Sequence, residues 1–416
     1  MKIALSLVLF SILASAETIT LEPIDVDETV LPAGSYMLSE DEAEETNSIT
    51  VQDRLERDVS FSVTTDIIGE SAVSFRGLDS KATEFVEDGI PLYRSVNGVI
   101  DTKLTLSNSE LYMNDGSGSS TFGVSPMGGE VTLVSKRPQG SFESRLNTTV
   151  STNDEYLYGY VGSRMGNVYV QADADIYHRS AYEISDDFEP RPVQEKGERI
   201  KSDKQQQSVS LESGIFLGEK TPLAAKVRLT TSEYGLPPNT STDLTFPVWD
   251  AYSRMDHKQM GSLYLYADYN ADSLVLSFRG YYDDYEDNFK IYDDVTYQST
   301  LPEVMYDDAR LGSVLKAEVK EDSYKTAVVL LVESNEHIRN GGGWNAATFK
   351  ADTLQGSLLH TWHLNDFLVL DGAMTYTVLQ AREAAEASAV EPADDKKALD
   401  AIAKITYENE QSTLYG

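Results

Sequence analysis

Residues 142–407 form a series of short segments in which apolar and polar residues alternate. A period of two places the apolar side chains of a β-strand on one face and its polar side chains on the other. In the segment 168–176, one face would carry Val168, Val170, Ala172, Ala174 and Ile176, and the other Tyr169, Gln171, Asp173 and Asp175. There are about eleven such segments of roughly 9–14 residues each, a length that suits tilted strands crossing a bilayer. The pattern predicts a large antiparallel sheet with one apolar face.

The connections between these segments alternate in length. Tight turns are predicted at Asn153-Asp154, Met165-Gly166, 218–221, 270–272, Glu321-Asp322 and Asn365-Asp366, and long polar loops near residues 181–204, 235–256, 283–307, 337–351 and 381–397. Short turns on one rim and long loops on the other are typical of a transmembrane β-barrel, whose apolar face contacts lipid and whose polar face lines the lumen. A soluble β-sandwich also alternates, but its loops need not be sorted in this way.

The N-terminal residues 1–16 have the features of a secretory signal peptide. Lys2 supplies a positive charge, residues 3–13 are apolar, and Ala14-Ser15-Ala16 is a small-residue cleavage site. This stretch is too short to cross a bilayer as a helix, and no later stretch is long and apolar enough to do so. If the protein lies in a membrane, it must therefore do so as a barrel.

Composition excludes several classes of function. The formal net charge is -34, from 68 acidic and 34 basic residues, which disfavours nucleic acid as a partner because phosphate binding needs a basic surface. Such a charge fits a solvated acidic surface or acidic loops that hold cations. The chain has no cysteine, which excludes disulfides, thiolate metal sites and cysteine nucleophiles. Its 24 tyrosines suit strands at a boundary between water and an apolar phase.

Two further regions precede the strands. Glu17, Thr18, Ile19, Thr20 and Leu21 form a β-prone segment, and the acidic stretch that follows it to residue 47 lacks periodicity. This region is expected to be an extended arm that could add as a strand to the sheet of a partner. Residues 48–138 are expected to form a compact α+β domain of short elements. It would include one short helix within residues 48–57, where Thr50 and Asp53 provide an N-cap signal.

Glycines punctuate the α+β domain. Arg76-Gly77 and Asp88-Gly89 each follow a short apolar run, and Asp-Gly is among the most favourable pairs for a tight turn. A second strand-like segment, residues 116–136, contains Gly116, Gly123, Gly128 and Gly129. Taken alone, these turns also fit an ordinary small mixed domain.

The order of these regions and two motifs resemble the TonB-dependent receptors of Gram-negative outer membranes. The motifs are Phe75-Arg-Gly-Leu78 followed by Asp88-Gly-Ile-Pro-Leu92, and Gly116 followed by Phe122-Gly123 and by Gly128-Gly129-Glu-Val-Thr-Leu-Val-Ser-Lys-Arg-Pro138. Asp115 and Ser117 depart from the basic residue and proline usual in the family, and Phe122 from the usual tyrosine, which leaves altered plug contacts open. The resemblance implies a signal peptide (1–16), a TonB-box arm and linker (17–47), a plug domain (48–138) and the N-terminal half of a β-barrel (139–416).

The resemblance also implies that the barrel is incomplete. The family's barrel has about 22 strands, and about eleven are present here. The chain stops at 412–416, entering a strand and without a terminal aromatic residue. Because unpaired strand edges are costly in lipid, an incomplete gene product or a fragment is expected. Ten or so further strands encoded downstream of Gly416 would test this expectation.

The function implied by the resemblance is energised uptake of a scarce small-molecule or metal-chelate ligand across the outer membrane. TonB would pair with the arm at Glu17–Leu21 and draw on the inner-membrane proton gradient. A ferric siderophore is the expected cargo, with cobalamin, haem, nickel chelates and saccharides open. Candidate ligand contacts are Tyr93 and Arg94 on the plug and Tyr234, Tyr252 and Trp344 on the loops.

Neither an enzyme, a resident cofactor nor a bound metal is expected. No Gly-x-Ser-x-Gly elbow is present, and His360 and His363 would lie on opposite faces of a strand. The acidic stretch 281–288 is expected to be a solvated loop rather than a Ca²⁺ site. Two alternatives stay open: a passive porin-like channel or adhesin, and a secreted soluble glycan-binding β-protein. Gradient-dependent uptake would distinguish the receptor from the channel, and cell fractionation would identify the secreted protein.

Overall fold

The computed structural model describes residues 36–37, 48, 50–65, 69–95, 98–102, 109–191, 193–217, 222–238, 240, 252–294, 296–341, 346–365, 367–386, 389–390, 395–409 and 412–415. The predicted signal peptide (1–16) and the segment Glu17–Leu21 lie outside the described residues. No helix among the described residues is long and apolar enough to cross a membrane.

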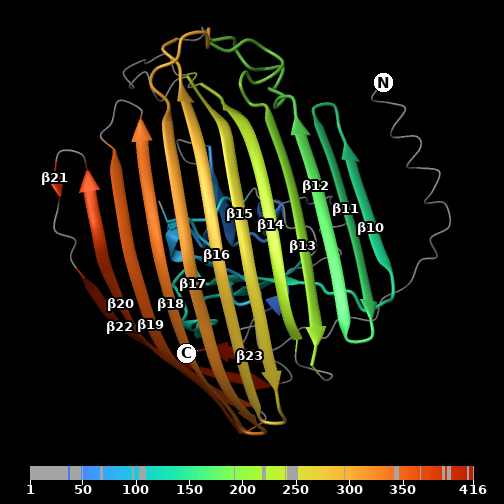
Figure 1. The fold of residues 1–416 in the computed structure, drawn as a ribbon, viewed down its shortest axis with the longest axis vertical. Helices are drawn as coiled ribbons and strands as arrows, with labels where there is room; N and C mark the ends of the chain where they lie inside the picture. The colour runs from blue at the N-terminus through green and yellow to red at the C-terminus, as the bar shows by residue number, and fades with distance from the viewer. Residues whose placement is uncertain are drawn as a thin grey trace.

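One curved antiparallel sheet, here called the large sheet, holds most of the described chain (Figure 1). Its long strands pair in sequence order: β10 (Glu143–Val150), β11 (Asp154–Met165), β12 (Val168–Arg179), β13 (Lys204–Phe216), β14 (Pro222–Leu236), β15 (Ser253–Asn270), β16 (Leu274–Ile291), β17 (Val304–Glu321), β18 (Tyr324–Gly341), β19 (Ala347–Asn365), β20 (Leu368–Glu386) and β22 (Lys396–Asn409). The short β21 (Ala389–Val390) pairs with β20, and β23 (Ser412–Tyr415) pairs with β22. Among the described residues, β10 and β23 are the edges of the sheet, so the predicted incomplete β-barrel is confirmed.

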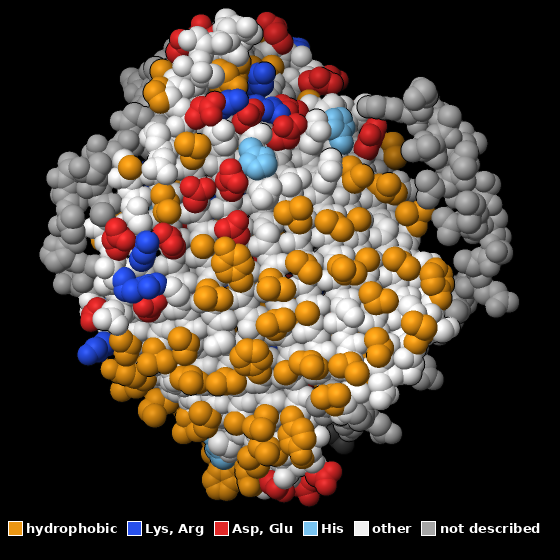
Figure 2. Space-filling model, in the orientation of Figure 1, with side chains coloured by type: hydrophobic (Ala, Val, Ile, Leu, Met, Phe, Trp, Pro, Cys, Tyr) orange, Lys and Arg blue, Asp and Glu red, His pale blue; other side chains and the backbone are white. Residues whose placement is uncertain are grey.

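The two faces of the large sheet are arranged as the alternation predicts. In β12, Val168 is 47% and Ile176 51% exposed, whereas Tyr169 and Asp175 on the other face are buried. Figure 2 shows apolar side chains spread across the middle of the outer face, with charged side chains near the end that carries the long loops, in a group at the left and at the opposite end. An exposed apolar outer face with a polar inner face is the arrangement of a barrel that contacts lipid.

The strands are longer than the alternation predicts. β15 to β18 each contain 18 residues, and the expected loops 283–307 and 337–351 shrink to the intervals between β16 and β17 and between β18 and β19. The prediction of a solvated loop at 281–288 is wrong, because this stretch lies within β16. Its carboxylates alternate, with Asp283 and Asp287 buried inward and Asp284 exposed. The inward carboxylates have cationic partners, which makes an acidic strand stable here.

An inner domain, defined as the described residues from Ser48 to Pro138, lies on the concave side of the large sheet (Figure 1). Its elements are α3 (Val51–Leu55), β2 (Phe61–Thr65), β3 (Ser71–Phe75), η1 (Ser80–Ala82), β4 (Glu84–Glu87), β5 (Ile90–Pro91), β6 (Ser109–Asn114), β7 (Ser119–Ser120), β8 (Gly123–Val124) and β9 (Glu130–Ser135). A mixed sheet runs in the order β1-β6-β9-β4-β5, with β1 (Tyr36–Met37) at one edge, and β2-β3 and β7-β8 pair as separate hairpins.

Local sequence explains the elements of the inner domain that were predicted. Thr50 and Asp53 form a reciprocal capping box at the start of α3, which buries Val51 and Leu55. The tight turn at Asp88-Gly89 is confirmed: both residues have positive φ, 50° and 84°, and join β4 to β5 through a two-residue loop. Positive φ at both positions is what a tight hairpin turn requires. Arg76 and Gly77 have the same conformation after β3.

Candidate functional site

The contact between the inner domain and the large sheet contains several buried ion pairs. Glu87, at the end of β4, accepts hydrogen bonds from Lys226 Nζ at 2.7 Å and from Arg228 Nη1 at 2.8 Å, both on β14. Lys226 also donates to Ser135 Oγ of the inner domain at 2.9 Å. Burial alone would raise the pKa of Glu87, but attraction to Arg228 and Lys226 outweighs it and holds that pKa well below its ordinary value. Glu87 therefore attaches β4 of the inner domain to β14 of the large sheet through buried ion pairs.

Arg94 forms a second anchor. Its guanidinium pairs with Glu70 of the inner domain, with Asp287 of β16 at 2.8 Å and with Asp308 of β17 at 3.1 Å. Burial would lower the pKa of Arg94, but these three carboxylates hold it well above its ordinary value. Lys258 of β15 adds a further link, because its Nζ lies 2.6 Å from Glu70 Oε1.

Arg310 of β17 binds the backbone of the inner domain. It is fully buried and donates to the carbonyl oxygens of Pro91 at 2.6 Å and Tyr93 at 2.8 Å. Its guanidinium also lies 3.1 Å from Asp283 and 4.1 Å from the centre of the Tyr93 ring. The Tyr93 hydroxyl in turn donates to Glu333 of β18. A single strand residue thereby fixes the segment that follows β5.

Two motif glycines lie where the large sheet leaves little or no room for a side chain. A Cβ at Gly89 would lie 3.3 Å from Nε of Arg279 on β16, which donates to the Asp88 carbonyl at 2.7 Å. At Gly123 a Cβ would collide with Ser357 and Thr375 on the large sheet. The glycines thus allow the backbone of the inner domain to approach the large sheet closely.

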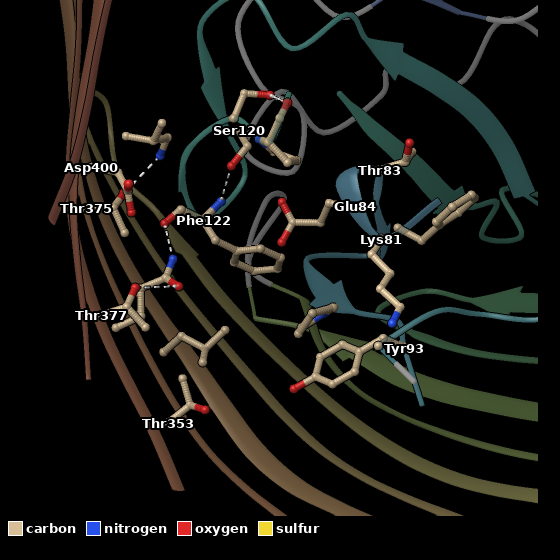
Figure 3. A pocket seen from close by; sticks show the side chains of 18 of the residues that line it. Lys81, Thr83, Glu84, Tyr93, Ser120, Phe122, Thr353, Thr375, Thr377 and Asp400 are labelled. Atoms are coloured by element: carbon tan, nitrogen blue, oxygen red, sulfur yellow. Dashed lines mark hydrogen bonds between the residues drawn. The ribbon is translucent and has the colours of Figure 1, made fainter. Parts of the chain in front are cut away.

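A cavity of 560 Å³ lies between the inner domain and strands β18, β19, β20 and β22 (Figure 3). Polar lining residues include Lys81, Glu84, Tyr93, Ser120, Glu333, Thr353, Gln355, Thr375, Thr377 and Asp400, and apolar ones include Phe85, Phe122 and Leu331. The volume is within the usual range of small-molecule sites, about 300–1,000 Å³. The mixture of hydroxyl, amide and charged groups suits a polar solute.

The predicted ligand contacts are dispersed. Tyr93 lines the cavity, whereas Arg94 is only 2% exposed and is surrounded by its carboxylate partners. Tyr234 is buried in a separate cluster with Met255 and Phe289. Tyr252 lies beside Tyr297, with ring centres 5.8 Å apart, and Trp344 lies outside the described residues. The structure does not gather the four described residues into one site, and the contact of all five with a ligand stays a prediction.

Sequence reasoning missed the cations of the large sheet that face inward. They are Lys226, Arg228, Lys258, Arg279 and Arg310. Each is a basic residue on the polar face of an alternating strand in a strongly acidic chain, and that position was the available signal. In the described part of the chain, no group of His, Cys, Asp and Glu residues is suited to hold a metal ion.

Comparison with known proteins identifies the fold. No family model matches the chain, and no curated protein does so either. The structure is similar to the copper transporter OprC, with a TM-score of 0.69 and 14% identity over 88% of this chain and 59% of that one. It is also similar to the alcaligin outer-membrane receptor FauA from Bordetella pertussis (TM-score 0.67, 14% identity, 97% and 64% covered) and to the ferric yersiniabactin uptake receptor FyuA from Yersinia pestis (0.65, 14%, 92% and 63%).

The chain spans about three fifths of the length of these solved structures. Its fold is that of the TonB-dependent outer-membrane receptors, as the sequence motifs predict.

Proposed function

We propose that the chain forms the plug and part of the barrel of an outer-membrane receptor that imports a small molecule. The observation that carries this proposal is an outwardly apolar sheet whose concave side is occupied by a domain held through buried ion pairs. The apolar outer face is stable against lipid. The occupied interior favours a gated receptor over a passive porin-like channel.

The cargo we propose is a metal chelate, with a ferric siderophore as the leading candidate. The similar structures described as receptors for alcaligin and for ferric yersiniabactin support this choice, and the copper transporter supports metal cargo more broadly. The plug apex at Tyr93 and Arg94 and the residues Tyr252 and Trp344 remain proposed contacts, together with Tyr234, which was predicted on a loop but lies near the end of β14. The receptor itself is proposed to be neither an enzyme nor the holder of a resident cofactor.

The proposed energy source is TonB, acting on the N-terminal arm. Glu17–Leu21 would pair with TonB by strand addition, which needs little beyond a free, extended, β-prone segment. Ligand occupancy at the plug would increase the exposure of the arm to the periplasm.

The test uses cells expressing the protein and a panel of radioactive-iron probes, namely ferric yersiniabactin, ferric alcaligin and ferric citrate. Deletion of residues 17–26 should abolish gradient-dependent uptake of any probe that binds, while binding to cells is unchanged. Uptake that continues in the deletion variant would contradict the role of the arm. Fractionation provides an independent check, because recovery from the culture medium instead of the outer membrane would favour a secreted soluble protein.

A further inference from the structure

The apolar outer face of the large sheet contains a groove. It lies across β15, β16, β17 and β18, on the half of these strands nearer the short turns, and has a volume of 450 Å³. Apolar side chains from all four strands line it, among them Ala267, Leu276, Ala317 and Val328. The four strands are paired continuously at this level, so the groove is not a gap between strands.

Small side chains leave the groove open. Ala317 of β17 is the register partner of Val328, and Ala267 of β15 is the register partner of Phe278. The ring of Phe278 lies towards Gly280, because a Cβ added at Gly280 would be 3.1 Å from Cζ of Phe278. The larger residues therefore form the sides of the groove, and the two alanines form part of its floor.

An acyl chain is the occupant that suits this groove. The groove is continuous with the apolar outer face, which is the face that contacts lipid (Figure 2). Its described lining includes two charged residues, Asp268 and Lys316, but these belong to the inner face, where Asp268 pairs with Arg279 and Lys316 with Glu318. Because an unfilled apolar space loses dispersion contacts, a chain laid into the groove is favoured over an empty groove.

The depth of the groove matches one leaflet of a bilayer. Ala317 and Leu315 precede the end of β17 at Glu321 by four and six residues, which is about 14 and 20 Å along the strand. With a strand tilt of about 35–45°, they lie roughly 10 and 15 Å from the short-turn rim. One leaflet contributes about 15 Å of hydrocarbon, so a lipid whose headgroup lies at the short turns can place a chain in the groove. Short turns face the periplasm in barrels of this kind.

The two turns beside the groove are acidic. They connect β15 to β16 and β17 to β18, and the amide of Lys320 donates to the Ser273 carbonyl at 2.9 Å, which places them side by side. Besides Lys320, they carry the exposed carboxylates of Asp272, Glu321 and Asp322. Lipid tails are as apolar as the groove itself, so the hydrophobic effect does not distinguish one lipid from another. The choice therefore depends on the headgroup, and these turns attract an ammonium group and repel a headgroup of net negative charge.

We propose that the groove across β15–β18 binds one acyl chain of a phospholipid from the periplasmic leaflet, and that the ammonium of its headgroup lies at the acidic turns. Phosphatidylethanolamine has this chemistry, whereas phosphatidylglycerol has the same tails and a net negative headgroup. Tyr269 lines the groove next to the end of β15 and is 54% exposed, which suits an amphipathic ring at headgroup level. The lipid site depends on neither the cargo nor TonB.

Native mass spectrometry tests the choice of headgroup. The purified full-length protein is released from nanodiscs that contain equal amounts of phosphatidylethanolamine and phosphatidylglycerol, and the retained lipid is identified by mass. Phosphatidylethanolamine should be retained at least about fivefold more often, the ratio given by one charge contact of about 1 kcal/mol at a membrane surface. Equal retention, a preference for phosphatidylglycerol or retention of neither lipid would overturn the proposal.

Two alanine positions test the groove. Ala317→Phe fills it and should abolish retention of the lipid. Ala174→Phe adds the same ring at an exposed outer-face position of β12, outside the groove, and should leave retention unchanged. Both rings face lipid, so the two variants are matched for folding. Equal retention by the two variants would show that the lipid is held elsewhere.

Neutral turns test the role of the carboxylates. The triple variant Asp272→Asn/Glu321→Gln/Asp322→Asn keeps the groove, so it should still retain a lipid but without a preference between the two headgroups. A preference that survives this substitution would contradict the role of the turns. These measurements involve no uptake, so their failure is distinct from a failure of the import function.

Discussion

At the scale of residues, the inner domain contacts the large sheet through charges that each have several partners. Glu87 has two cations and Arg94 has three carboxylates. Removing one member of such a group leaves the others charged and buried, whereas an exposed charge is largely compensated by water. These positions should therefore be far more sensitive to substitution than the acidic surface of the same chain.

The substitution Glu87→Gln tests this expectation. It retains the shape of the side chain but removes the carboxylate that pairs directly with Lys226 and Arg228, so it should lower the free energy of unfolding by about 3–5 kcal/mol. Glu155→Gln, at an exposed position of β11, should change it by less than about 0.5 kcal/mol. Denaturant unfolding in matched lipid measures both variants. Equal effects would contradict the anchoring role of Glu87.

The buried carboxyl pair Glu84 and Glu130 predicts that the stability of the folded protein depends on pH. Burial, and then repulsion from Glu130, raises the pKa of Glu84 from 4.5 to about 8. Burial also raises the pKa of Glu130, although hydrogen bonds from Thr121 and Thr132 and the charge of Lys316 on β17 oppose it. Lys81, Glu333 and Asp400 line the same cavity as Glu84.

Because the folded-state pKa of Glu84 is raised, its contribution to stability is fully present below about pH 4.5 and is lost as the pH rises through about 8. A difference of one in pKa between the folded and unfolded states corresponds to about 1.4 kcal/mol. Thermal unfolding between about pH 5 and pH 9 should show a decline that is smaller in Glu84→Gln. Parallel curves for the two proteins would show that Glu84 does not titrate in this range.

At the scale of elements, a short turn can require glycine for two reasons. The backbone at that position can have a positive φ, and neighbouring atoms can lie too close to leave room for a side chain. Gly89 has φ of 84° and lies against Arg279. Gly166, in the turn between β11 and β12, has φ of 61°, and no atom lies within 4 Å of the position that its Cβ would take. Comparing substitutions at the two glycines therefore separates the effect of backbone strain from the effect of steric contact.

Gly89→Ala should destabilise the protein more than Gly166→Ala does. Both substitutions place a side chain in the left-handed region, at a cost of about 1–2 kcal/mol. Only Gly89→Ala also displaces Arg279 and weakens its hydrogen bond to the Asp88 carbonyl. Thermal unfolding of the two variants measures the difference, and indistinguishable values would show that Arg279 moves aside without cost.

At the scale of the whole molecule, the exposed apolar face implies a lipid environment with a defined depth. Leu263 lies in the middle of β15, and Met305 lies near the start of β17 beside the long-loop rim; both are exposed on the outer face. In a soluble protein, arginine at either position would be nearly neutral.

In a bilayer the two positions should differ. Leu263→Arg should destabilise the folded protein by about 2–4 kcal/mol, and Met305→Arg by about 0–1 kcal/mol. Unfolding from lipid vesicles measures both values. If the two substitutions have the same small effect, the apolar face is not buried in lipid.

Features that depend on neighbouring residues could be predicted from the amino-acid chain alone. The alternation predicted which face of each strand is apolar. The pair Asp88-Gly89 predicted a tight turn, and Thr50 with Asp53 predicted the start of α3. The acidic composition of 281–288 misled the prediction, because local charge does not reveal whether a partner is available.

Which charges meet depends instead on the folded arrangement of distant segments. Glu87 and Lys226 are 139 residues apart, and Tyr93 and Glu333 are 240 residues apart, yet each pair is in direct contact. Alternation shows that a side chain faces inward, but which partner it finds there depends on the register of distant strands and on the position of the domain that they enclose.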